Sequence, residues 1–99
     1  MAALPPSEGV LVHAVLVAVS ISDEAAAREA LDKQVVPVVS QLPGFVAGYW
    51  LEPKDGKGWS TVIFDSEESA RQAAEGVRSR APESVTVDHV ETRAVVANA

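Results

Sequence analysis

An almost uninterrupted apolar run occupies Gly9–Ser20, with the sequence GVLVHAVLVAVS, and His13 is its one basic position. A short run rich in valine predicts a β-strand, and apolar residues at both odd and even positions predict that both of its faces are covered. Such a strand belongs in the centre of a sheet. The preceding residues 1–8 include Pro5-Pro6 and are predicted to form a flexible leader.

The next segment changes from a continuous apolar run to a helical stripe. Ser22 is placed to cap a helix, and the two acidic residues after it suit the first turn, where the helix dipole favours negative charge. Apolar residues then recur at steps of three and four, at Ala27, Leu31, Val35, Val38, Val39 and Leu42. Pro37 lies inside this stripe and lacks a backbone N–H, so we expect the helix to kink or break near Val36. Pro43-Gly44 is predicted to stop it.

A hairpin is predicted after this helix. Residues 45–52 (FVAGYWLE) and 59–65 (WSTVIFD) have the composition of strands, and the loop between them carries the turn signal Asp55-Gly56.

A second helix and a last strand complete the pattern. Asp65 or Ser66 caps this helix, with Asp65 and Glu68 at the spacing of a capping box. Its apolar stripe consists of Ala70, Ala73, Ala74 and Val77. The final strand is Val85–Val96, whose apolar positions change parity along its length, so we expect a β-bulge near Asp88-His89.

The resulting order, β-α-β-β-α-β, predicts an α+β protein with the ferredoxin-like split βαβ arrangement, formed by one domain over residues 9–97. Right-handed crossovers place the first and third strands in the middle of an antiparallel four-stranded sheet, with both helices on one face. Large apolar residues of both parities then leave the other face in need of cover. A second copy of the chain is the simplest cover, so the sequence predicts a homodimer that closes a barrel through its sheet faces.

Composition and charge narrow the range of functions. The 99 residues contain no cysteine, which excludes a disulfide scaffold, thiolate metal sites and a thiol nucleophile. A net charge of −6 argues against binding to nucleic acid or to an anionic membrane. The first 27 residues contain no Lys or Arg, so no basic segment of a secretory signal precedes the apolar run. A cytoplasmic protein is therefore expected.

Three stretches of the chain resemble a known superfamily. They are Val35-Val36-Pro37-Val38-Val39, then Leu42-Pro43-Gly44-Phe45 followed by Trp50, and Val62–Ala70. Together they are similar to the dimeric α+β barrel superfamily, and to its antibiotic-biosynthesis-monooxygenase-like (ABM-like) branch, over roughly residues 10–96. The resemblance implies a ferredoxin-like protomer and a range of activities. Members include cofactor-independent quinone-forming oxygenases, haem-degrading enzymes, haem-dependent peroxidases and proteins with no assigned reaction, so the fold alone does not select one.

The chain departs from two branches of this superfamily. The oxygenase branch typically pairs an Asn with a Trp near the reacting carbon, whereas Asn98 is the single Asn of this chain. The haem-degrading branch uses a helical His with a nearby Asn, and neither predicted helix contains a His. Both departures count against these reactions.

Two histidines are the candidates for a catalytic base. His13 and His89 lie on the first and last predicted strands, which are expected to be antiparallel neighbours. They could act as base and partner, but a structural or surface role is the more common use of such residues. No metal is expected, because no HxH or HExxH spacing supplies the further ligands.

Aromatic residues are the candidates for ligand contacts. Tyr49, Trp50, Trp59 and Phe64 lie on the two hairpin strands. Aromatic walls suit flat ligands, although the same residues serve equally well in a core or a dimer interface. Strand alternation places Tyr49 and Trp50 on opposite faces, so both cannot line one pocket.

These observations predict two classes of function. One is a small oxygenase that acts without cofactor on an aromatic or polyketide-like molecule, with His13 or His89 as base. The other is a non-catalytic dimer that binds a small apolar or aromatic ligand or has a purely structural role. A pocket in which a histidine faces an aromatic wall would favour the enzyme. A haem-binding protein is the less favoured third alternative.

Overall fold

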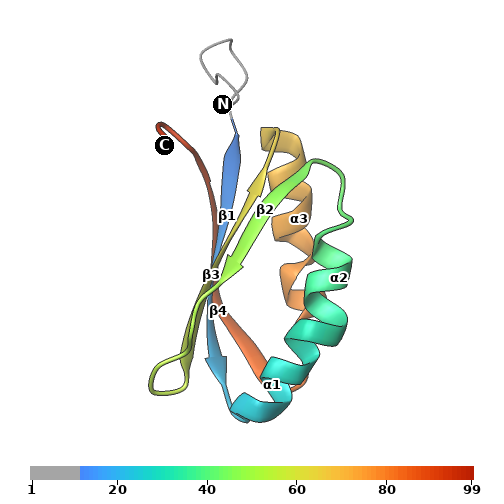
Figure 1. The fold of residues 1–99 in the computed structure, drawn as a ribbon, viewed down its shortest axis with the longest axis vertical. Helices are drawn as coiled ribbons and strands as arrows, with labels where there is room; N and C mark the ends of the chain where they lie inside the picture. Colours follow the sequence, from blue (N-terminus) through green and yellow to red (C-terminus); the bar gives the residue numbers. More distant parts are fainter. Residues whose placement is uncertain (1–11) are drawn as a thin grey trace.

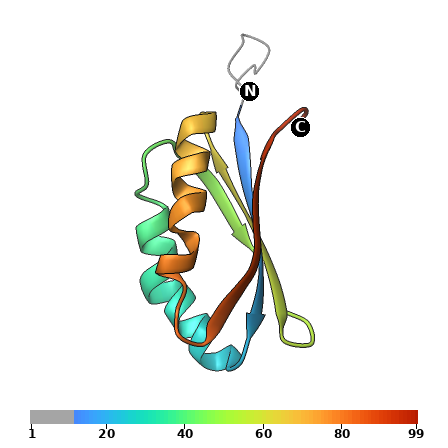
Figure 2. The same cartoon turned by 180° about the vertical axis from the view of Figure 1, so that it is seen from behind.

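A computed structural model describes residues 12–99, and the predicted leader therefore lies outside the described residues. The elements follow the chain as β1 (His13–Ile21), α1 (Glu24–Ala30), the π-helical segment η2 (Leu31–Val35), α2 (Val36–Val39), β2 (Phe45–Trp50), β3 (Lys57–Phe64), α3 (Glu67–Arg80) and β4 (Val85–Ala94). The four strands form one antiparallel sheet in the order β2-β3-β1-β4. All the helices lie on one side of this sheet, as Figures 1 and 2 show from opposite directions. The predicted α+β class with a four-stranded antiparallel sheet is confirmed.

The first helix begins one residue later than predicted. Asp23, with extended backbone, is its N-cap, and its Oδ1 accepts a hydrogen bond of 3.0 Å from the backbone N–H of Ala26. The prediction that Ser22 caps this helix is wrong. Its hydroxyl instead donates to the carbonyl of Ser84, 3.3 Å away. The carboxylate at the cap also suits the positive end of the helix dipole.

The interruption expected near Val36 is present as a widened turn. Residues of η2 have π-helical geometry, in which the N–H of Val36 donates to the carbonyl of Leu31, five residues earlier. Pro37 follows directly, at the start of α2. Because proline cannot donate to the carbonyl four residues before it, a wider turn here lets the chain remain helical through the proline.

The hairpin turn and the bulge are both as predicted. Asp55 and Gly56 have positive φ values of 53° and 75°, the backbone of a type I′ turn, and Lys54 and Lys57 pair across it. On β4, Ala18 of β1 faces His89 while Val19 faces Val87. Asp88 is therefore the extra residue of a β-bulge.

The core lies between the sheet and α3. Val15, Phe64 and Ala70 are 2 %, 1 % and 0 % exposed. The Phe64 ring meets Phe45 edge-on, with centroids 6.3 Å apart. Alanines on the buried stripe of α3 allow this helix to pack close to the strands. Its N-cap is Ser66, whose hydroxyl accepts from the N–H of Ser69, so the capping box predicted from Asp65 is not formed.

Candidate functional site

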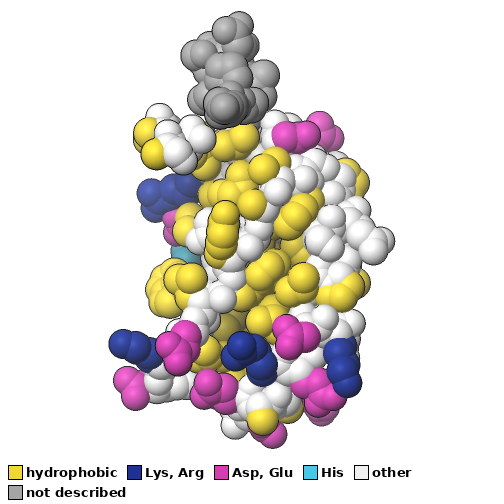
Figure 3. All heavy atoms as spheres, in the orientation of Figure 1, with side chains coloured by type: hydrophobic (Ala, Val, Ile, Leu, Met, Phe, Trp, Pro, Cys, Tyr) yellow, Lys and Arg dark blue, Asp and Glu magenta, His cyan; other side chains and the backbone are white. Residues whose placement is uncertain are grey.

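A cavity of about 590 Å³ lies between the sheet and the helices. In Figure 3 hydrophobic side chains gather in a hollowed band between the hairpin strands and the helices α1 and α2, with charged side chains near its lower end. The apolar lining comes from every layer that encloses the cavity. It includes Val15, Val17 and Val19 of β1, Ala27, Leu31, Val35 and Val36 of the helical segment, Trp50, Val62 and Phe64 of the hairpin, and Ala73 and Val77 of α3.

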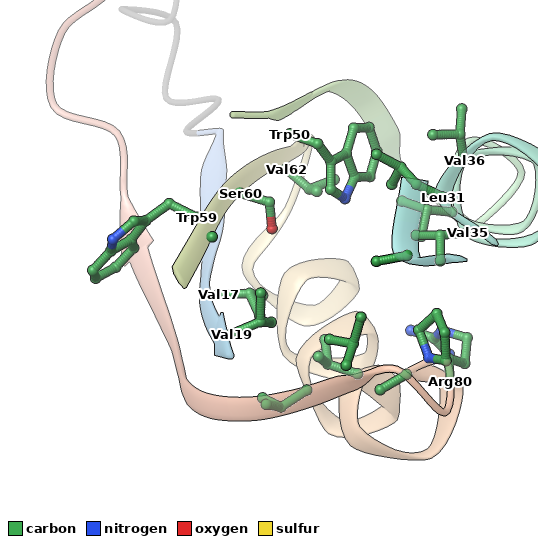
Figure 4. A pocket seen from close by; sticks show the side chains of 18 of the residues that line it. Val17, Val19, Leu31, Val35, Val36, Trp50, Trp59, Ser60, Val62 and Arg80 are labelled. Atoms are coloured by element: carbon green, nitrogen blue, oxygen red, sulfur yellow. The ribbon is translucent and has the colours of Figure 1, made fainter. Parts of the chain in front are cut away.

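Trp50 forms one wall, and a glycine on its own strand positions it. Its indole lies over Gly48, two residues earlier on the same face of β2, so that a Cβ added to Gly48 would be 2.8 Å from Cη2 and from Cζ3 of the ring. Figure 4 shows the indole in the space between the sheet and the helices. Because Gly48 has no side chain, the Trp50 indole can lie on the surface of β2 and line the cavity.

Ser60 is the one buried polar side chain among the described residues, at 8 % exposure. It pairs with Val17 on β1 and with Trp50 on β2, and its hydroxyl points into the cavity (Figure 4). Within residues 12–99, none of the hydrogen bonds uses Ser60 Oγ or Trp50 Nε1. Both groups are therefore available to a bound molecule.

Arg80 supplies a cation at the far wall (Figure 4). Its side chain folds back over Gly76, where an added Cβ would be 2.2 Å from Nη1, and its Nη2 donates to the carbonyl of Ala73 at 3.0 Å. Among the described residues no carboxylate lies within ion-pair distance of Arg80. The guanidinium is held by its own helix and keeps further N–H groups for another partner.

Other charged residues line the cavity as well. Glu24, Arg28 and Asp32 follow one another at steps of four along the helical segment, and Glu52 follows β2. Arg28 is thus one turn from a carboxylate on either side, unlike Arg80.

The four aromatic candidates divide between the two faces of the sheet. Trp50 and Phe64 face the helices, although Phe64 is also part of the sealed core. Tyr49 and Trp59 are 60 % and 54 % exposed. Trp59 contributes to the lining, but Figure 4 shows its indole on the far side of the sheet. Of the four candidates, Trp50 is therefore the one that faces the cavity without being fully buried in the core.

The two histidines point to opposite faces. His13 pairs with Phe64 and so faces the helices, whereas His89 pairs with Ala18 and faces away from them. Their partner positions on β1 are five residues apart, or about 17 Å along a strand. Neither is among the residues that line the cavity. The geometry therefore gives no support to a shared histidine site or to a histidine base in the cavity.

His89 belongs to a ladder of charges on β4. Its Nε2 lies 2.6 Å from Oε1 of Glu91, and Arg93 pairs with the other oxygen of that carboxylate. The hydrogen bonds from His89 and then Arg93 lower the pKa of Glu91 from its ordinary value near 4.5. His13 differs, because its Nδ1 is buried with no hydrogen-bond partner in the described part of the chain.

The part of the chain that the structure describes contains neither a cluster of metal-ligating side chains nor a helix long and apolar enough to cross a bilayer. No group of three or more His, Asp or Glu side chains gathers where a metal ion could be held within residues 12–99. None of the helices in this range has the length and hydropathy needed to cross a bilayer.

Ser60 and Arg80 were not identified as site residues from the sequence. Neither was Gly48, over which Trp50 lies, nor Gly76, over which Arg80 folds. Ser60 lies two and four residues before Val62 and Phe64, so strand alternation could have placed it on the same buried face. Arg80 follows Gly76 by one helical turn, but nothing in that spacing indicates that the side chain folds back over the glycine.

No protein-family model and no curated protein matches the chain. The site offers a flat indole, an apolar floor and the hydrogen-bond donors of Ser60, Trp50 and Arg80.

Proposed function

We propose that the chain is an ABM-like, ferredoxin-like protomer that binds a small apolar or aromatic molecule between its sheet and its helices. The single observation that carries this proposal is the cavity of about 590 Å³. Ligand pockets commonly enclose about 300–1,000 Å³, with mostly apolar walls and a few placed polar groups. Valine, leucine and indole surfaces supply the walls here, and Ser60 and Trp50 supply uncommitted donors.

A neutral fluorescent probe tests this function. N-phenyl-1-naphthylamine is expected to bind with saturation and with an increase in its emission. Leu31 lines the cavity, so Leu31→Trp is expected to reduce the number of probe molecules bound or their affinity. The matched control is Val38→Trp, on the same helical segment but 47 % exposed and outside the lining. Equal binding by both variants, or no binding by the wild type, would refute the proposed site.

The proposed homodimer rests on the free face of the sheet. Strand pairing places Ile63 beside Ala14, Tyr49 beside Thr61 and Leu16, and Trp59 beside Ala18 on this face. Exposed aromatics at the centre of an apolar surface are typical of protein interfaces. A second copy of the chain would cover this surface, whereas the cavity lies between the sheet and the helices.

Light scattering at micromolar concentration tests the dimer. The wild type is expected to have about twice the mass of one chain. Trp59→Asp is expected to give monomers, because it places a charge within the proposed interface, whereas Val38→Asp on the helical side is expected to leave the mass unchanged. A wild-type monomer would refute the barrel.

A second candidate is a cofactor-independent oxygenase of aromatic molecules that occupy the same cavity. Favouring it, the Ser60 hydroxyl and the Trp50 N–H point into a largely apolar space, where donors stabilise a developing phenolate strongly. In this alternative neither His13 nor His89 acts as the base, because neither lines the cavity. Oxygen uptake with an anthrone, whose methylene would become a carbonyl as water is released, is the test. Uptake that Ser60→Ala and Trp50→Phe leave unchanged would refute it.

A further inference from the structure

Two arginines line the cavity, and of the two only Arg80 has no acidic residue one turn away on its own helix. Arg80 lines it, donates one hydrogen bond to the backbone carbonyl of Ala73 and has no carboxylate within ion-pair distance among residues 12–99. A guanidinium carries five N–H groups in a fixed plane, so a single bond to a carbonyl leaves most of them free.

The placement of this cation is built into α3. The side chain lies against Gly76, where a Cβ would be 2.8 Å from Cζ and 2.2 Å from Nη1. Together with the bond to Ala73, this contact holds the guanidinium beside α3 at the cavity wall, although the residue as a whole is exposed. A donor held in place before binding loses less conformational entropy when a ligand arrives.

The other arginine of the lining is not equivalent. Arg28 is flanked by Glu24 and Asp32, each one helical turn away and also part of the lining. Opposite charges at this spacing attract along a helix, although neither carboxylate is within ion-pair distance of Arg28 among residues 12–99. The chain as a whole carries −6, so it does not attract anions in general. A preference for an anion in this cavity would therefore originate at Arg80.

We propose that the ligand is an aromatic or apolar acid, whose carboxylate pairs with Arg80 while its apolar body lies against Trp50 and the valines of β1. This inference rests on the proposed binding function and specifies its ligand class. A planar carboxylate matches the fork of a guanidinium, which can donate two parallel hydrogen bonds to it. The carbonyl of Ala73 accepts one N–H of Nη2, and the other N–H groups of the guanidinium make no side-chain hydrogen bond among residues 12–99.

Two ligands of the same shape test the inference. 2-Naphthoate and 2-naphthamide differ mainly in charge, and both can be titrated by calorimetry or by quenching of tryptophan emission. The wild type is expected to bind naphthoate at least about tenfold more tightly than naphthamide, the size of effect given by one charge-assisted pair. Arg80→Gln is expected to remove this difference by weakening naphthoate alone.

Controls separate the charge of Arg80 from the stability of the fold. Arg71 is exposed, lies on the same helix and does not line the cavity, so Arg71→Gln is expected to keep the wild-type preference. Arg80→Lys, which keeps the charge without the fork, is expected to give an intermediate preference. Circular dichroism checks that each variant folds.

The possible results distinguish this inference from the proposed function. Equal affinity of the wild type for the two naphthalenes, or an equal loss of both in Arg80→Gln, would overturn the role of Arg80 while binding of the neutral probe persists. If neither naphthalene nor the neutral probe binds, the proposed function fails and the inference fails with it.

Discussion

Replacing Gly76 with alanine is predicted to make the protein more stable and a weaker binder of carboxylates. Gly76 lies inside α3, a helix of 14 residues, and its φ is not positive. An alanine therefore fits the helical backbone without strain. The contact that it disturbs is the Arg80 guanidinium, whose Nη1 would be 2.2 Å from the new Cβ.

Two opposing contributions determine the magnitude. Glycine in a helix interior is less favourable than alanine by about 0.8–1 kcal/mol. Displacing Arg80 breaks its bond to the Ala73 carbonyl, and a net hydrogen bond contributes about 0.5–1.5 kcal/mol. The lower value applies, because Arg80 is exposed and finds water instead. The balance is a gain of about 0.5 kcal/mol, or about 2–4 °C in Tm for a domain of this size.

Thermal and urea unfolding measure the gain, and titration with 2-naphthoate measures the loss of affinity. Gly76→Ala is expected to weaken naphthoate and to leave naphthamide unchanged, since the apolar walls do not move. Ala74→Gly, on the same helix but not in the lining, is the matched control, and it is expected to lower Tm and preserve the ligand preference. A raised Tm with unchanged naphthoate affinity would show that Gly76 does not position Arg80. A Tm lowered by several degrees would refute the energetic argument.

Three further predictions concern the fold itself. Phe64→Ala removes a ring that is 1 % exposed and should cost about 3–5 kcal/mol in urea unfolding; a loss below 1 kcal/mol would contradict its place in the core. Ser66→Ala removes the cap of α3 and should cost about 1 kcal/mol, with Ser79→Ala near the end of the helix as a control that does not remove the cap. The fold lowers the pKa of Glu91. Its ionised carboxylate therefore stabilises the folded protein above the ordinary pKa of about 4.5, and this stabilisation is lost as the pH falls through the pKa that Glu91 has in the folded state. Glu91→Gln should therefore flatten the decline of Tm below pH 4.5, and an unchanged decline would contradict the pairing with His89 and Arg93.

The elements were predictable where local chemistry determines them. Asp55-Gly56 favours a type I′ turn, and Pro37 prevents regular helical bonding, so both features follow from a few residues. The bulge at Asp88 was equally predictable, because Val87 and Val90 can face one core only if an extra residue lies between them.

The site was less predictable, because it depends on side-chain directions across several elements. Alternation correctly separates Tyr49 from Trp50, but it does not show which of the two faces the helices. The histidines could be placed on neighbouring strands, yet their faces depend on register and on the bulge. The backward fold of Arg80 over Gly76 is a rotamer choice that no periodicity encodes.

The bulge on β4 connects the two faces of the sheet. By adding Asp88 to one strand, it turns both Val87 and Val90 toward the helices and places His89, Glu91 and Arg93 on the free face. That face is therefore apolar over β2, β3 and β1 but charged along β4. Because charges are costly to bury without partners, a second copy that covers the apolar strands would leave this ladder at the rim of the interface or pair it with charges of its own. The same bulge that completes the core beneath the cavity thus limits where a partner can lie.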